Sequence, residues 1–138
     1  MIFLDEHNRL LPGGTALKDP CTLHEGIVAY KRFTGEQVMI HKSRSIGQAA
    51  VTLPSYFSDG KCKLVRTRTP QSLAEGEAVV QKAYAESQRA TPWTPFDNCE
   101  DFVSRAYTGQ SGSATRNFVV CCLALVSVCA LAVGASRS

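Results

Sequence analysis

The sequence predicts a small α+β domain followed by a membrane anchor. Five strand-like segments come first and two helix-like segments follow, an order typical of α+β folds. After them comes an uncharged run of 20 residues, 117–136, between Arg116 and Arg137. As a helix, such a run would span about 30 Å, the thickness of a bilayer's hydrocarbon core. We therefore expect one domain with its linker over residues 1–115, and a C-terminal transmembrane helix over residues 116–138.

The strands are predicted from short segments rich in apolar and β-branched residues. These segments are residues 14–18, 23–30, 36–41, 48–53 and 62–67. The turn-like stretch KRFTG joins the second segment to the third and predicts an antiparallel hairpin. The last segment overlaps the basic cluster KCKLVRTR, which fits either a solvated strand face or a contact with anionic lipid headgroups.

Two helices are predicted from their capping signals. Residues 70–88 begin with a proline, and Ser72 with Glu75 three residues later predicts an N-cap. The prolines of TPWTP keep the next stretch extended up to a second helix, at about residues 98–107, which Gly109 ends. The sequence GQSGSAT then forms a short flexible linker to the uncharged run.

The predicted hairpin brings together two of the three histidines. If residues 31–34 form a four-residue loop, Tyr30 faces Gly35 and His24 faces His41, with Cβ atoms about 5 Å apart. Either histidine alone fits a solvated strand end. As a pair, one imidazole can fix the tautomer and orientation of the other, as a carboxylate does in catalytic triads.

Cys99 lies in the sequence PFDNCEDFV and is the third candidate residue. Asp97 or Asn98 can cap the second helix, which places the thiol in the first turn, where the helix dipole favours an anion and lowers the pKa of a cysteine. The two acidic residues that follow oppose ionisation, so the thiolate needs an imidazolium partner, and His24 can be that partner. A thiol, an imidazole and an orienting imidazole are the parts of a nucleophilic acyl-transfer site.

These motifs resemble the LRAT (lecithin:retinol acyltransferase) family over roughly residues 12–136. HEGI lies on an early strand, IHKS follows it, and NCEDF is similar to the family's Asn-Cys-Glu-His-Phe motif, with Asp101 in place of the histidine. The small H-Ras-like-suppressor phospholipase/acyltransferases of this family also end in a membrane span. The resemblance implies a circularly permuted papain-like (NlpC-type) domain, a small antiparallel sheet packed with helices. It assigns Cys99 as the nucleophile, His24 as the base and His41 as the orienting residue.

The function that the resemblance implies is a membrane-anchored thiol acyltransferase or phospholipase. It would act on glycerophospholipid acyl esters through an acyl-cysteine intermediate, with no cofactor and no metal. Cys21 and His24 have the spacing of zinc ligands, but no second closely spaced pair accompanies them. Two alternatives stay open: a cysteine peptidase or amidase of the NlpC type, and a catalytically inactive, membrane-tethered interaction module.

Charge and cysteine content indicate the compartment and the partners. The first 14 residues include the acidic Asp5 and Glu6 and do not form a signal peptide, so we expect a tail anchor with the domain in the cytosol. The three cysteines before the span are then expected to be thiols rather than disulfides. With 15 Lys and Arg against 12 Asp and Glu, and two of the arginines flanking the span, the domain is close to neutral. The expected partners are therefore a phospholipid membrane and acyl-lipid substrates, not nucleic acid.

Overall fold

Five strands form one antiparallel sheet in the order β4-β3-β2-β1-β5. In the computed structural model, which describes residues 1–112, each strand overlaps a segment predicted from the sequence. The exposed side chains of the edge strand β5 form a solvated strand face, which was one interpretation of the basic cluster. The strands are β1 (Ala16–Asp19), β2 (His24–Tyr30), β3 (Gln37–Lys42), β4 (Ala49–Thr52) and β5 (Val65–Arg68).

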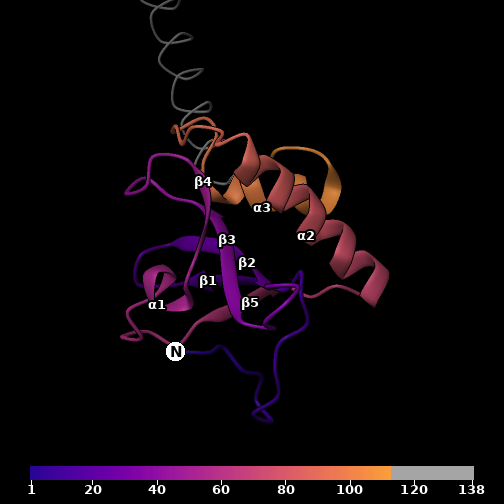
Figure 1. Ribbon diagram of the computed structural model, residues 1–138. Coiled ribbons are helices and arrows are strands. Elements are labelled where there is room, and N and C mark those ends of the chain that lie inside the picture. The colour runs from indigo at the N-terminus through magenta and orange to yellow at the C-terminus, as the bar shows by residue number, and fades with distance from the viewer. Residues whose placement is uncertain (113–138) are drawn as a thin grey trace, which may run out of the picture.

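Helices cover both faces of this sheet, and the predicted α+β class is confirmed. Figure 1 shows α2 (Leu73–Gln88) and α3 (Cys99–Thr108) together on one face, and the short α1 (Pro54–Phe57) on the other. The Ser72 side chain caps α2 by accepting from the Glu75 N–H at 3.1 Å, as predicted. Helix α1 was not predicted from the sequence, although a proline at the first helical position is a known start signal.

The two faces of the sheet carry two separate hydrophobic clusters. On the helix side, Ile27 and Ile40 pack with Val79 of α2 and Phe102 of α3. On the opposite side, the cluster consists of Leu11, Leu17, Val28, Met39 and Phe57. Successive residues of β2 therefore point into different layers, as the pleat of a strand requires.

The hairpin of β2 and β3 differs from its predicted register by two residues. The Lys31 N–H donates to the Glu36 carbonyl at 2.9 Å, so the four-residue loop is 32–35 rather than 31–34. Gly35 supplies the left-handed conformation, with φ of 72°, that closes the turn one residue later. As a result Tyr30 faces Gln37, and His41 faces Gly26 rather than His24. Each strand shifts by one residue, so both histidines still lie on the same face.

Cys21 and Cys62 form a disulfide, which corrects the expectation of free thiols in this domain. Their Cα atoms lie 5.9 Å apart although 41 positions separate them in the sequence. They meet because β1 pairs with both β2 and β5, which brings the turn after β1 next to the loop before β5. Within the described residues, Cys99 is the free cysteine.

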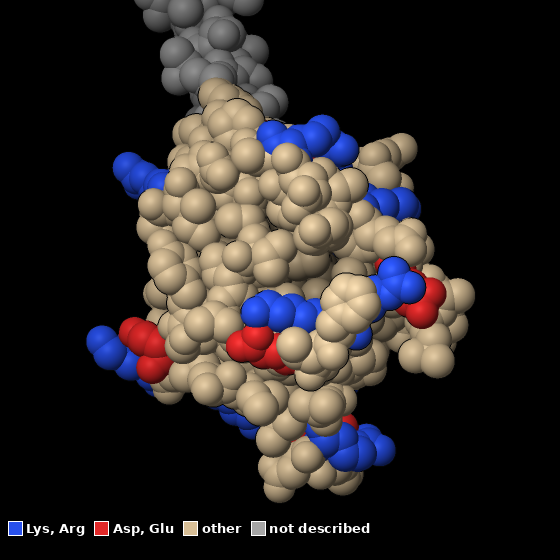
Figure 2. Space-filling view, viewed as in Figure 1, with Lys and Arg blue, Asp and Glu red and all other residues tan. Residues whose placement is uncertain are grey.

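The surface seen in Figure 2 carries its charges in small groups separated by uncharged areas. None of the helices in residues 1–112 is both long enough and apolar enough to cross a bilayer. The predicted span at 117–136, within the anchor segment 116–138, lies outside the described residues.

Candidate active site

The two strand histidines are joined ring to ring. The Nε2 atom of His24 lies 2.5 Å from the Nδ1 atom of His41, within hydrogen-bonding distance. Cβ atoms lie closest when two residues face each other directly, but His24 is diagonal to His41 across the ladder. Two imidazole side chains are long enough to meet at this diagonal distance. Gly26 makes room for it, because a Cβ there would lie 2.9 Å from the Phe57 ring and 3.0 Å from the His41 Cβ. The sequence thus predicted the contact, but through the wrong register.

Burial keeps both imidazoles neutral. His41 is 1% exposed, and burial, with a smaller contribution from the neighbouring His24, lowers its pKa to about 3. Burial also lowers the pKa of His24 to about 4, while the nearby Asp19 carboxylate works in the opposite direction. The Phe57 ring packs against both, with centroids 5.0 Å from His24 and 5.4 Å from His41. A small cavity of about 260 Å³, bordered by the two rings and the hydroxyl groups of nearby side chains, opens beside the pair.

Cys99 is the first residue of α3, and its sulfur lies against the start of β2. The thiol donates to the Leu23 carbonyl at a distance of 3.9 Å, and the backbone N–H of Glu25 also bonds to the sulfur. The nucleophile candidate therefore touches the residues on both sides of His24. Leu23 adopts the left-handed conformation, with φ of 60°, which is a strained position for a residue with a side chain.

The thiol is not poised as an anion, which corrects the expectation from its place in the helix. Burial is the largest influence and raises the pKa of Cys99, and the charges of Glu100 and Glu25 raise it further. Its hydrogen bonds to the backbone at Glu25 and Glu100 lower the pKa but do not outweigh burial. Glu25 itself is largely buried, and its carboxylate accepts from the Thr67 hydroxyl at 2.6 Å. The site at rest therefore holds a neutral thiol and two neutral imidazoles.

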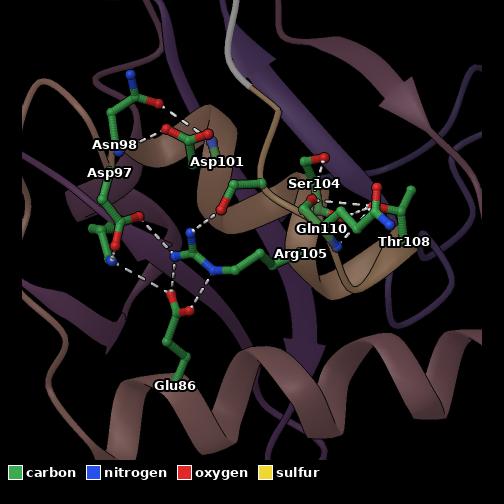
Figure 3. A network of polar contacts seen from close by, with 10 residues as sticks. Glu86, Asp97, Asn98, Asp101, Ser104, Arg105, Thr108 and Gln110 are labelled. Atoms are coloured by element: carbon green, nitrogen blue, oxygen red, sulfur yellow. Dashed lines mark hydrogen bonds and ion pairs between the residues drawn. The ribbon is translucent and has the colours of Figure 1, made fainter. Parts of the chain in front are cut away.

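The start of α3 is fixed by a reciprocal cap. The Asn98 side chain accepts from the N–H groups of Glu100 and Asp101, and the Asp101 carboxylate accepts from the Asn98 N–H. Asp101, which stands where the LRAT motif has a histidine, thus serves as the N3 residue of a capping box whose N-cap is Asn98. This arrangement, visible in Figure 3, holds the backbone that carries Cys99.

A partly buried ionic cluster holds α3 to the rest of the fold. Arg105 of α3 donates through two nitrogens to both carboxylate oxygens of Glu86 in α2, at 2.8 and 3.0 Å, and also to Asp97 at 2.8 Å (Figure 3). Lys42 follows His41 in β3, and its fully buried ammonium lies 3.2 Å from Asp97 and 3.5 Å from Glu86. Charged contacts therefore connect the strand of one histidine to the segment just before Cys99.

One group of three side chains has its donor atoms close enough together to hold a metal ion, but two of them are already joined in a disulfide. Asp19, Cys21 and Cys62 place their ligand atoms within 4.8 Å of one another. Both sulfurs belong to the disulfide, and the Asp19 carboxylate accepts from the Cys21 N–H and the Ser58 hydroxyl. His24, which the sequence suggested as a zinc ligand together with Cys21, is not a member of this group.

Sequence reasoning missed two side chains that contact the histidine pair. Thr52 lies 2.7 Å from the Nε2 atom of His41, and Phe57 packs against both rings. The signal for Phe57 was available in the proline that starts α1. Thr52 could have been found only from the pairing of β3 with β4, which places it opposite Met39 and diagonal to His41.

Comparison of the chain with protein-family models, curated proteins and solved structures found no match. The resemblance to the LRAT family therefore stays a prediction from the motifs.

Proposed function

We propose that this protein is a cysteine-dependent acyltransferase or phospholipase that acts on membrane glycerophospholipids through an acyl-cysteine. The observation that carries the proposal is the hydrogen-bonded pair of His24 and His41, next to the segment that touches the Cys99 sulfur. A nucleophile, a base and a group that orients the base are what such a reaction requires. The LRAT-like motifs at these same three residues support the same assignment.

The proposed reaction begins from neutral groups. His24 accepts the thiol proton while the Cys99 sulfur attacks the ester carbonyl, so the thiolate forms only as the carbon–sulfur bond forms. The Asn98 side chain occupies the N–H groups of Glu100 and Asp101. The Cys99 N–H, which this cap does not use, stabilises the oxyanion of the tetrahedral intermediate.

The intermediate then collapses with balanced proton transfers. The ester carbon–oxygen bond breaks, and the departing lysolipid alcohol takes the proton back from His24, which leaves a thioester on Cys99. Water, an alcohol or an amine then attacks the thioester and gives its proton to His24. Release of the acyl product returns that proton to the cysteine sulfur, so hydrolysis and transfer differ only in the acceptor.

We extend the proposal to the fold and the membrane. A circularly permuted papain-like arrangement is supported by the order of the elements, because the histidine strands precede the cysteine helix. Membrane attachment is proposed from the sequence alone, since residues 117–136 are uncharged and long enough to span a bilayer. A tail anchor with the domain facing the cytosol would keep the site close to lipid esters at high local concentration.

A second candidate function, a cysteine peptidase or amidase of the NlpC type, is favoured by one observation. Disulfides persist in oxidising compartments, and the Cys21–Cys62 bond does not fit a domain facing the cytosol. A domain on the other side of the membrane could use the same nucleophile and base on amide bonds. The two candidates differ in the bond that acylates Cys99.

The test is the mass of the intact protein after incubation with a phospholipid of known acyl chains, and in parallel with a peptide amide. We expect the phospholipid to add one fatty-acyl mass that hydroxylamine removes, and we expect Cys99→Ala to abolish it. His24→Ala should also abolish the adduct, whereas the matched control His7→Ala, at an exposed histidine, should retain it. An adduct that persists in Cys99→Ala refutes the nucleophile. Acylation by the amide alone supports the second candidate, and none from either substrate supports an inactive interaction module.

A further inference from the structure

The histidine pair continues into a longer chain of hydrogen bonds. The Nε2 atom of His41 lies 2.7 Å from the Thr52 hydroxyl oxygen, and that hydroxyl donates to the Leu53 carbonyl at 3.3 Å. The Leu53 carbonyl is itself held in place, because it also accepts from the Tyr56 N–H at 3.0 Å in the first turn of α1. The chain thus ends on a carbonyl, a group that can only accept.

The donor and acceptor roles along this series of hydrogen bonds follow from the carbonyl at its end. A hydroxyl has one hydrogen, and when Thr52 donates it to Leu53, the threonine oxygen can only accept from the ring. His41 then carries its proton on Nε2 and presents a lone pair at Nδ1. Since a neutral imidazole has one N–H, His24 must donate from its own Nε2 to that lone pair. His24 is left with an unprotonated Nδ1.

We propose that Thr52 is a positioning residue that sets the tautomers of both histidines and so leaves Nδ1 of His24 free to accept the thiol proton. This inference rests on the proposed function for its catalytic meaning. Thr52 acts through His41, since its hydroxyl bonds to that ring and to the Leu53 carbonyl.

The opposite direction of the chain would disable the base. If Thr52 donated to His41, His41 would carry its proton on Nδ1 and donate it to Nε2 of His24. His24 would then hold its own proton on Nδ1, the one ring nitrogen that the pair leaves for the cysteine. The two arrangements use the same ring positions and differ only in where the threonine hydrogen points.

The surroundings of Thr52 keep it in place for this role. Thr52 pairs with Met39 in the ladder between β3 and β4, which aims its side chain toward the face of the sheet that carries His41. Phe57 of α1 packs on both rings, and the Leu53 carbonyl lies at the N-terminus of that same helix. Strand β4 and helix α1 together fix the acceptor, the hydroxyl and the rings.

The test compares Thr52→Val, which keeps the branched shape without the hydroxyl, with Thr52→Ser, which keeps the hydroxyl. Full-length protein in detergent micelles, labelled with ¹⁵N-histidine, reports the tautomer of each ring by nuclear magnetic resonance near neutral pH. We expect both His24 and His41 to carry the proton on Nε2 in wild type and in Thr52→Ser, and to become tautomer mixtures in Thr52→Val. Exposed His7 is the internal reference, since no substitution should change it.

The kinetic measurement uses a short-chain soluble ester. Loss of one orienting hydrogen bond should lower kcat in Thr52→Val about tenfold with KM unchanged, and Thr52→Ser should restore most of it. The inference is overturned if wild-type His24 carries its proton on Nδ1, or if Thr52→Val changes neither tautomers nor kcat. If the tautomers are as expected but Cys99 is never acylated, the role of Thr52 is supported and the proposed function is refuted.

Discussion

Burial of the two histidine rings makes the stability of this fold depend on pH. The pKa of His24 is lowered to about 4 and that of His41 to about 3, whereas an unfolded chain has histidine pKa values of about 6.5. As the pH falls below about 6.5, the unfolded chain therefore binds protons that the folded protein refuses. The stability that these rings contribute is fully present above that pH and is lost as the pH falls toward the folded pKa values. Between about pH 7 and pH 5, the loss amounts to about 2 kcal/mol per ring, or about 4 kcal/mol in total.

The assay is urea unfolding at the two pH values, followed by the fluorescence of Trp93, the single tryptophan. The double variant His24→Gln, His41→Gln removes both titrating groups and should show most of this pH dependence abolished, whatever its absolute stability. Glu25 contributes with the opposite sign, because burial raises its pKa, but it is common to both proteins and cancels in the comparison. Equal slopes of stability against pH in the two proteins would refute buried, neutral histidines.

Four further predictions test other parts of the structure. Lys42→Met should destabilise the fold by about 1–3 kcal/mol in urea unfolding, because Glu86 and Asp97 lose one of their two cationic partners and keep only Arg105; a loss of stability within experimental error would contradict the role of Lys42 in the ionic cluster. Replacing Cys21 and Cys62 by alanine should cost up to about 4 kcal/mol, the chain entropy of a loop of 41 residues, and reductant should then have no further effect on the midpoint. The acid limb of kcat/KM should lie at about pH 4, the pKa of His24, and a limb at an ordinary histidine pKa would argue against the buried base. Truncation after Ser113 should retain activity on a soluble ester and lower activity on intact vesicles at least about tenfold; equal activity on vesicles would mean that the segment beyond is not needed to reach lipid.

Helices α2 and α3 were predictable because their capping signals are local. Ser72, Asn98 and Gly109 each act within one turn of the helix end that they define, so the printed sequence contains the whole interaction. The register of the hairpin, in contrast, could not be read from the residues next to the turn. A loop at 31–34 and a loop at 32–35 are both plausible in sequence, and the left-handed Gly35 decides between them. The histidine contact survived the error because a shift of two residues keeps each side chain on its face.

The properties of Cys99 could not be predicted from its neighbours in the sequence. The N-terminal turn of a helix predicts a lowered pKa, but burial against β2 raises it, and one of the opposing charges, Glu25, comes from a strand far away in sequence. The disulfide and the contact of Thr52 with His41 likewise depend on strand pairing. Such features follow from tertiary structure and have no signal in a single segment of the chain.

The proposed nucleophile and base belong to two different layers of the molecule. His24 and His41 point to the side of Phe57, whereas Cys99 belongs to the helix layer on the other face of the sheet. The distance between sulfur and base is then a property of how one layer sits on the other, and a misplacement of about 1 Å can cost a hundredfold in rate. Helix α3 carries the thiol at its first residue. Any contact that shifts this helix relative to the sheet would therefore change the rate of acylation, even if it touches none of the three candidate residues.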